Sequence, residues 1–195
     1  MMRIGLVSVV VALMGAGATA ALPVPEPLAT RDSRLVARDP RPATSDTLIV
    51  FLIRHAEKAD DSRDPPLSDE GKARAEGVAR LLGDAGVTRI WSTNLLRTRH
   101  TAQPLADRLG LPVETYDPMA LNAFADGLRR LPGRHLVVGH SNTTPDVVKA
   151  LGGTPGEAIQ DTEYDRLYAL VIVGESVTTT LLRFGARSSG KERSP

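Results

Sequence analysis

The chain has 195 residues, a formal net charge of +1 and no cysteine. A nearly neutral chain creates no field that would draw it to nucleic acid or to an anionic membrane, and no basic run with interleaved aromatic residues is present. The lack of cysteine excludes disulfides, thiolate metal sites, cysteine catalysis and a lipoprotein anchor. With 42% apolar and 24% charged residues, the composition and length are those of one globular domain.

The first residues have the pattern of a secretory signal peptide. Met1-Met2-Arg3 is a positive start, residues 4–16 are almost wholly apolar, and Ala18-Thr19-Ala20 matches the small-x-small pattern before a cleavage site. We therefore expect residues 1–20 to be a cleaved signal peptide and the protein to be periplasmic or secreted by a bacterium. The alternative is an uncleaved anchor, because residues 4–22 are just long enough to span a bilayer.

The segments that flank the expected domain are polar. Residues 21–45 are rich in Pro, Arg, Asp, Ser and Thr without apolar periodicity, so we expect a flexible linker there. Residues 187–195 form a polar tail. The folded domain is expected to cover residues 46–186.

Apolar runs and helical patterns alternate along this domain. Residues 47–53 are a continuous apolar, β-branched run, typical of a strand buried on both faces. Ser68-Asp69-Glu70 predicts a helix start, because a capping side chain precedes two acids, and Gly83 or Gly86 predicts its end. Further strands are expected at residues 89–92, 111–114, 135–139, 167–173 and 177–183, and further helices at about 97–109, at about 121–131 and from Thr144 or Pro145. The last two strands are expected to form a hairpin across residues 174–176.

This alternation predicts an α/β fold, a three-layer sandwich with a mostly parallel sheet, whose site lies beyond the carboxyl ends of the strands. Two of the buried strands end in histidine: one runs into Arg54-His55 and the other into Gly139-His140. We therefore expect both imidazoles at the same edge of the sheet. His135, at the start of its strand, and His100, on the exposed side of a helix start, are expected to be structural or solvated.

Three motifs at these strand ends resemble those of the histidine phosphatase superfamily, the phosphoglycerate mutase-like proteins. Arg54-His55-Ala56-Glu57 resembles the Arg-His-Gly-Glu signature, and Ala56 suits that loop if its φ is negative. Residues 92–97, which end in Arg97 and are followed by Thr101-Ala102, look like the second motif. Gly139-His140-Ser141-Asn142 looks like the third. The motifs stand in the family's order, Pro66-Leu67-Ser68 is similar to the family's Pro-Leu-Thr segment, and the resemblance spans residues 47–184.

The resemblance implies a phosphatase of this fold that forms a phosphohistidine on His55, which water then hydrolyses. One neutral ring nitrogen attacks phosphorus, and the other needs an acceptor, for which we expect a backbone carbonyl. Arg54 and Arg97 would hold the phosphoryl oxygens by forked hydrogen bonds, and a protonated His140 would donate to the same oxygens. Asn142 is expected either to bind the phosphate or to tie its loop to the next helix. No metal or other cofactor is required, because these cations neutralise the charge.

The general acid is the open assignment. Residues 114–118 lack the glutamate motif of the mutase-like branch, and His140-Ser141 stands where the phytase-like branch has His-Asp. We rank Asp117 first, Glu57 second and Glu114 third. Their structural alternatives are a turn before Pro118 for Asp117, and an ion pair with Arg54 for Glu57, since an arginine at the end of an apolar strand needs an anion. A phosphoramidate substrate such as phosphohistidine needs less help from an acid.

The expected ligand is a phosphorylated small molecule or a phosphate group on a larger molecule, with no nucleic acid and no stable membrane association after cleavage. The aspartates of loop 59–64 are expected to form a solvated rim, and Lys58 either to be solvated or to reach an anionic part of the substrate. The main alternative is a non-catalytic periplasmic binder of a phosphorylated ligand, against which the intact His55 argues. A serine hydrolase is disfavoured because Thr143 stands where a nucleophile elbow needs glycine. A mutase is disfavoured because the polar tail offers no obvious cover for a bisphosphate intermediate.

Overall fold

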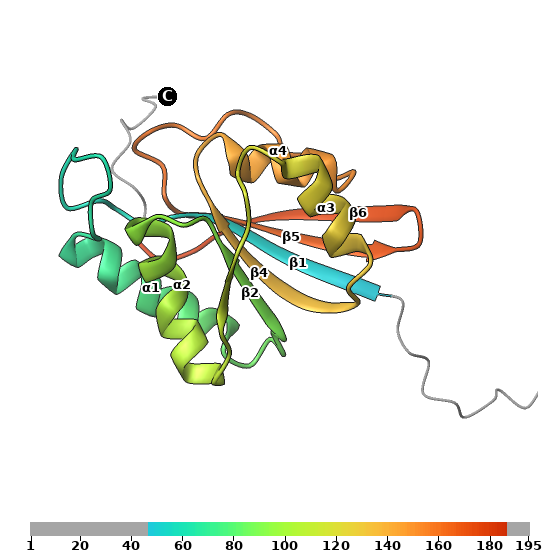
Figure 1. The fold of residues 1–195 in the computed structure, drawn as a ribbon, viewed down its shortest axis with the longest axis horizontal. Coiled ribbons are helices and arrows are strands. Elements are labelled where there is room, and N and C mark those ends of the chain that lie inside the picture. Colours follow the sequence, from blue (N-terminus) through green and yellow to red (C-terminus); the bar gives the residue numbers. More distant parts are fainter. Residues whose placement is uncertain (1–46, 187–195) are drawn as a thin grey trace, which may run out of the picture. The chain divides into compact units, whose positions relative to one another are not determined.

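The computed structural model describes residues 47–186 (Figure 1). The expected signal peptide (residues 1–20), the expected linker (21–45) and the polar tail (187–195) lie outside the described residues. The elements alternate in chain order much as the sequence predicts. They are β1 (Thr47–Arg54), α1 (Asp69–Leu82), β2 (Arg89–Ser92), α2 (Leu96–Leu109), β3 (Val113–Thr115), α3 (Leu121–Arg129), β4 (Gly133–Gly139), α4 (Thr143–Ala150), β5 (Arg166–Val173) and β6 (Ser176–Arg183).

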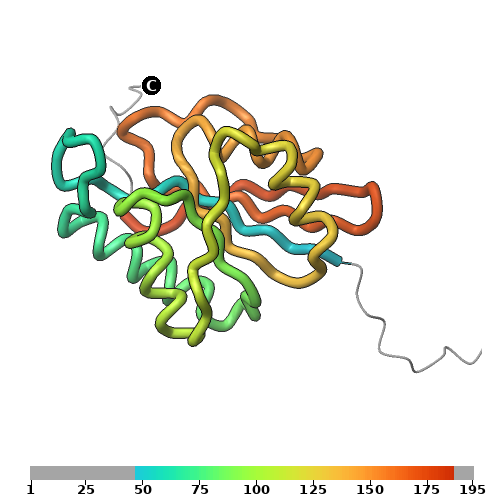
Figure 2. Tube along the Cα trace, in the orientation of Figure 1, coloured from blue at the N-terminus to red at the C-terminus, as the bar shows by residue number. Residues whose placement is uncertain are grey.

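The strands form one sheet in the order β3-β2-β4-β1-β5-β6. The first four are parallel, so their carboxyl ends meet at one edge. β5 runs antiparallel to β1, and β6 returns beside it through the hairpin that the sequence predicts. β1 and β4 lie side by side in the middle of the sheet, in a register that opposes Arg54 to Gly139 (Figure 2). The mostly parallel sheet is therefore confirmed, with an antiparallel addition at one side.

The two faces of the sheet carry separate apolar clusters, as Figure 1 shows with α1 and α2 on one face and α3 and α4 on the other. Residues of β1 alternate between them: Val50 and Leu52 pack toward Val147 and Leu128 of the α3–α4 layer. Ile53 faces the α1–α2 layer with Val78 and Leu105. Because β1 is covered on both faces, its continuous apolar run is what a central strand requires.

Local sequence rules explain the start of α1 but not the course of α2. The Ser68 side chain accepts a hydrogen bond from the Gly71 amide, which caps α1 as expected. Pro104 lies in the interior of α2, not in its first turn, so the carbonyl of His100 lacks its helical donor. His100 is exposed there, and water reaches that side of the helix.

Among the described residues, no helix has both the length and the apolar character that crossing a membrane would demand.

Candidate active site

His55 stands immediately after β1 and is almost completely buried. Its Nδ1 lies 2.8 Å from the carbonyl oxygen of Ala56, and a carbonyl only accepts, so Nδ1 carries the proton and Nε2 keeps its lone pair. Burial lowers the pKa of His55 to about 3, and the charges of Arg54 and Arg97 add to this lowering. At neutral pH the ring is therefore neutral, with a nucleophilic Nε2.

His140 follows β4, and its ring lies edge-on to that of His55, with the ring centroids 5.4 Å apart. The parallel register of β1 and β4 produces this proximity, since the amide of His55 also donates to the carbonyl of Gly139. Burial, then the charges of Arg97 and Arg54, lowers the pKa of His140 to about 4. The expectation that both imidazoles meet at one edge of the sheet agrees with this geometry.

Arg54 is buried at the end of β1, and its ion-pair partner is not Glu57. Its Nη1 donates to three backbone carbonyls of the segment before β5: Gln160 (2.8 Å), Asp161 (2.9 Å) and Glu163 (3.1 Å). The ring of Tyr164 lies against the guanidinium, 4.2 Å from its central carbon. Nε of Arg54 is buried without a partner among the described residues. A buried, unpaired donor of a cation is what an anion site needs.

Arg97 comes from the first turn of α2 and is held from the opposite side. Its Nη1 lies 3.7 Å from the carboxylate of Asp64, a weak ion pair, and its Nε is buried with no partner in residues 47–186. Asp64 also accepts a hydrogen bond of 2.8 Å from the Leu96 amide, so it caps α2. One aspartate of the expected solvated rim therefore has a structural role beside the site.

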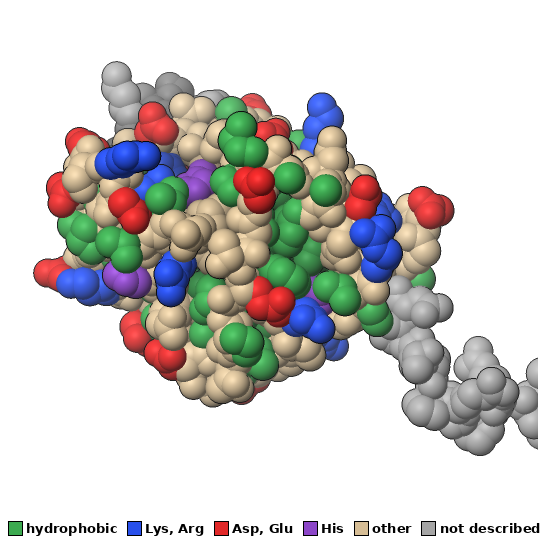
Figure 3. Space-filling model, in the orientation of Figure 1, with side chains coloured by type: hydrophobic (Ala, Val, Ile, Leu, Met, Phe, Trp, Pro, Cys, Tyr) green, Lys and Arg blue, Asp and Glu red, His purple; other side chains and the backbone are tan. Residues whose placement is uncertain are grey.

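These residues line a cavity of about 280 Å³. Its lining is basic or neutral: Arg54, Lys58, Arg63 and Arg97, then His55 and His140, then Ser62, Pro65, Ser141 and Asn142. No carboxylate of the described residues lines it. Elsewhere on the visible face, acidic and basic side chains are interspersed, so the basic character belongs to the cavity and not to a broad patch (Figure 3). The cavity therefore suits a phosphoryl group.

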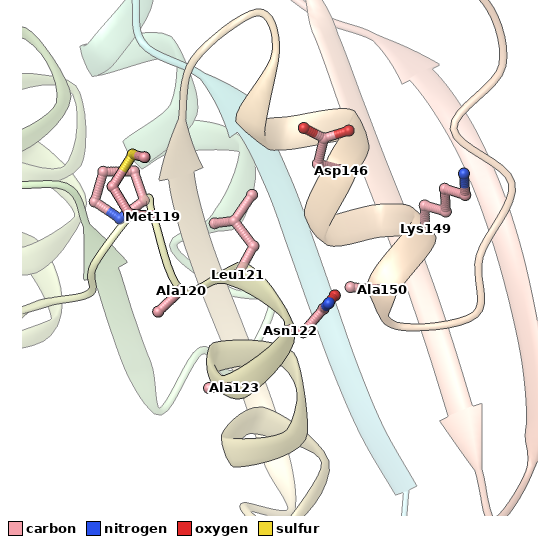
Figure 4. A pocket seen from close by; sticks show the side chains of 9 residues that line it. Met119, Ala120, Leu121, Asn122, Ala123, Asp146, Lys149 and Ala150 are labelled. Atoms are coloured by element: carbon pink, nitrogen blue, oxygen red, sulfur yellow. The ribbon is translucent and has the colours of Figure 1, made fainter.

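Two larger cavities carry no comparable chemistry. One, of about 690 Å³, lies between the start of α3 and α4, where Figure 4 shows Met119 and Leu121 on one side and Asp146 on the other. The second, of about 610 Å³, lies along α1 and includes the Glu57–Arg74 ion pair. Neither is lined by a histidine.

The three candidate acids lie outside the cavity, so the ranking that placed Asp117 first needs correction. Asp117 is exposed, and its carboxylate accepts from the Met119 amide in a turn, which is its structural alternative. Both carboxylate oxygens of Glu57 accept from Arg74 of α1, at 2.6–2.9 Å. Glu114 pairs with Arg89 at 3.0 Å. None of these three carboxylates lies in the cavity with His55, although Glu57 is only two residues away in the chain.

The remaining predicted residues are placed as follows. Asn142 lines the cavity, and its side chain makes no capping bond to α4, so it remains available to an oxyanion. Lys58 lines the mouth and pairs with exposed Asp61. His135 is fully buried inside β4, which begins at Gly133, two residues before the expected start at residue 135. The Nε2 of His140 contacts Thr93 and not Ser141, so these two neighbours do not form the Ser–His pair of a serine hydrolase.

Sequence reasoning missed three residues that support the site. Thr101 accepts from the Ala56 amide at 2.9 Å and donates to the Arg97 carbonyl at 2.7 Å, so it ties the nucleophile loop to α2. Tyr164 covers Arg54, and its ring centroid lies 6.1 Å from that of His55. Thr93 contacts His140. Thr101 stood in the second motif, and Thr93 in the same segment, but hydroxyl residues are too common for their partners to be inferred from sequence.

Comparisons with known proteins found similar sequences for part of the chain. The family model described as histidine phosphatase superfamily (branch 1) matches residues 50–120. A protein of Yersinia enterocolitica named probable phosphoglycerate mutase GpmB is 38% identical over 78 residues, and this match spans 36% of each chain. The chain thus matches little more than a third of that relative's length.

Solved structures extend the similarity over most of the described residues. The protein histidine phosphatase SixA, solved with tungstate, aligns with a TM-score of 0.57 and 21% identity over 69% of this chain and 96% of that one. A putative alpha-ribazole-5'-P phosphatase from Escherichia coli aligns with a TM-score of 0.58 and 17% identity over 74% of this chain and 100% of that one. At such identities the likeness concerns the fold, which matches the expected one.

Proposed function

Because the chain belongs to the histidine phosphatase superfamily, we propose that it is a metal-independent phosphatase that works through a phosphohistidine on His55. The observation that carries this proposal is the fixed tautomer of His55, which donates Nδ1–H to the Ala56 carbonyl and keeps Nε2 free. In the first step Nε2 forms a bond to phosphorus while the bond to the leaving group breaks. In the second step water attacks phosphorus, the N–P bond breaks, and phosphate leaves.

The charges of the cavity support this chemistry. Arg54 and Arg97 each have a buried Nε without a partner in the described residues, so both can donate to phosphoryl oxygens without giving up an existing bond. Charge on these oxygens persists through the transition state, and preorganised cations stabilise it by position and field. A phosphoryl dianion would also favour a second proton on His140, which then becomes a third cationic donor.

The leaving group is the finer part of the proposal. No carboxylate of the described residues lines the cavity, so no carboxylic acid stands ready to protonate an alkoxide. Such a site favours substrates whose leaving group departs without one, either a phosphoramidate or an ester of an acidic alcohol. The solved relative with tungstate is named a protein histidine phosphatase. We therefore propose a phosphoramidate, or a phosphomonoester with a good leaving group, as the substrate.

Two further functions use the same cavity. The missing acid is compatible with a non-catalytic binder of a phosphorylated ligand. The curated relative is named a probable phosphoglycerate mutase, and that activity would return the phosphoryl group to substrate instead of water. Incubation with phosphoglycerate tests the mutase, because a mutase releases the isomer, whereas turnover of an ester with a good leaving group separates a phosphatase from a binder.

The decisive experiment is hydrolysis of p-nitrophenyl phosphate by the full chain in excess EDTA, beside His55→Ala and beside His100→Ala as a control on an exposed histidine. Turnover that survives EDTA, is lost in His55→Ala and persists in His100→Ala is expected. Quenching in alkaline SDS should trap a phosphoenzyme that is stable in base and labile in acid, in the wild type and in His100→Ala but not in His55→Ala. Equal turnover of the His55→Ala variant would refute the nucleophile. Vanadate binding that requires Arg97, without turnover of any substrate, would favour the binder.

We also propose that the protein is exported, on the basis of residues 1–20 alone. Cell fractionation tests this point: periplasmic or extracellular protein that begins near Ala21 is expected. Cytoplasmic protein that retains residues 1–20 would contradict it.

A further inference from the structure

A chain of hydroxyl groups ends on His140. Thr93 and Thr98 are both fully buried between β2 and the first turns of α2. The Oγ1 atoms of the two threonines are 2.9 Å apart, and the Oγ1 of Thr93 lies 3.0 Å from Nε2 of His140. No step of the mechanism above uses either threonine.

The surroundings of Thr98 determine the direction of this chain. Its Oγ1 lies 3.0 Å from the carbonyl oxygen of Thr93 and 2.9 Å from that of Leu95. A hydroxyl has one proton and a carbonyl has none, so the Thr98 proton must point to these carbonyls. If it pointed to Thr93 Oγ1 instead, two carbonyl oxygens would face Thr98 Oγ1 at hydrogen-bond distance with no proton between them.

The direction of the next two bonds follows. Thr98 Oγ1 accepts from the hydroxyl of Thr93, because its own proton is already used. Thr93 has then spent its single proton and presents only lone pairs to the imidazole. Nε2 of His140 must therefore be the donor in its contact with Thr93.

We infer that Thr93, oriented by Thr98, is a positioning residue that holds a proton on Nε2 of His140, so that Nδ1 is the atom that serves the phosphoryl group. Nδ1 has no hydrogen-bond partner in residues 47–186, and the His140 ring lines the cavity. In the neutral ring Nδ1 is therefore unprotonated. When a phosphoryl group binds, a second proton on Nδ1 donates to its oxygen, while Nε2–H remains bonded to Thr93. The assignment of Nδ1 to the substrate rests on the proposed function, but the protonation of Nε2 does not.

Other charged groups around His140 act on the same ring. Arg97 and Arg54 both disfavour its cationic form, and the ring of His55 stands edge-on at 5.4 Å. The backbone amide of His140 donates to the hydroxyl of Thr143, at 3.0 Å, which holds the main chain in place. The ring has one hydrogen bond to a described residue, that to Thr93. Thr93 therefore decides which nitrogen carries the first proton, whereas the arginines and the bound anion decide whether a second is taken up.

The first test reads the tautomer directly. Long-range ¹H–¹⁵N correlation spectra of the full chain at pH 7.5 distinguish protonated from unprotonated ring nitrogens, and His140→Gln assigns the signals among the four histidines. Neutral His140 with its proton on Nε2 is expected in the wild type and in Thr93→Ser. Thr93→Val should shift the population toward Nδ1–H. A wild-type His140 with its proton on Nδ1, or an unchanged tautomer in Thr93→Val, would overturn the inference.

The second test reads its consequence for the bound anion. Thr93→Val should weaken binding of inorganic phosphate, and lower kcat/KM for p-nitrophenyl phosphate, by roughly tenfold, the scale of one hydrogen bond to a charged group. Thr93→Ser should restore both, and Thr178→Val, on the exposed face of β6, serves as the matched control. Thr98→Val should give an intermediate loss, because it leaves Thr93 in place but frees its proton. Phosphate affinity unchanged in Thr93→Val, beside a shifted tautomer, would overturn the role of Nδ1. The spectra and the phosphate titration need no turnover, so they remain decisive even if the proposed activity fails.

Discussion

Replacement of His135 by leucine is expected to reduce the dependence of stability on pH. His135 is fully buried in β4, and both of its ring nitrogens lack a hydrogen-bond partner in the described residues. Burial, with a smaller contribution from Arg89, lowers its pKa to about 4. The His135 imidazole is therefore neutral in the folded protein, because burial opposes its protonation.

The sign and the size of the effect follow from this pKa. As the pH falls, the unfolded chain, in which histidine titrates near 6.5, takes up the proton before the folded chain does. The free energy of unfolding therefore decreases between about pH 6.5 and pH 4. Above pH 6.5 the contribution to stability is fully present, and below about pH 4 it is lost. A difference between 6.5 and about 4 corresponds to about 3 kcal/mol of unfolding free energy, most of it lost by pH 4.5.

The assay is urea unfolding of the full chain, followed by circular dichroism at several pH values between 7.5 and 4.5. His55 and His140 also have lowered pKa values, but they are present in both proteins and cancel in the difference. The wild type should lose roughly 2–3 kcal/mol more than His135→Leu over this range. His100→Leu, at an exposed position, should follow the wild type. Parallel profiles for wild type and His135→Leu would refute the assignment of a buried, neutral imidazole.

Three further predictions concern the groups around the site. Arg74→Ala should destabilise the protein by about 2–4 kcal/mol in urea unfolding, because it leaves the half-buried Glu57 carboxylate unpaired; a loss below about 1 kcal/mol would mean that water replaces the arginine. Asp117→Asn should change kcat/KM for phenyl phosphate less than about threefold, whereas a ~10²-fold fall would restore Asp117 as the acid. Thr101→Val should lower kcat/KM by roughly 10–100-fold, since the Ala56 amide loses its acceptor and the loop that orients His55 shifts; wild-type kinetics would show that the loop keeps its position without this bond.

The elements that position the histidines were predictable from local patterns. Residues 48–53 of β1 are all apolar, so the strand belongs inside a sheet, and parallel strands carry whatever follows them to one common edge. This reasoning places His55 beside His140 without any knowledge of the side-chain contacts. The hairpin of β5 and β6 was visible in the same way, from two β-rich runs around a glycine turn.

The partners of the site residues were not predictable, because they come from segments that are distant in the chain. An ion pair with Glu57, three residues away, was the structural alternative for Arg54, but Arg54 binds carbonyls more than a hundred residues later. Glu57 turns instead to α1, where Arg74 faces it. His135 is a polar residue at the start of an apolar run, and only the tertiary packing around it, which includes Trp91 of the neighbouring strand β2, shows that it is enclosed. Such contacts depend on the tertiary fold and leave no periodic signal.

The register of β1 against β4 has a consequence for how the protein loses activity. Arg54 is opposed to Gly139, and the His55 amide donates to the Gly139 carbonyl, so the nucleophile is bonded into the middle of the sheet. Central strands exchange their amide hydrogens only when the whole domain opens, whereas loops and edges open earlier. The His55 amide should be among the slowest to exchange, and heating should abolish activity together with the fold and not before it. Catalytic competence and global unfolding would then be a single cooperative event.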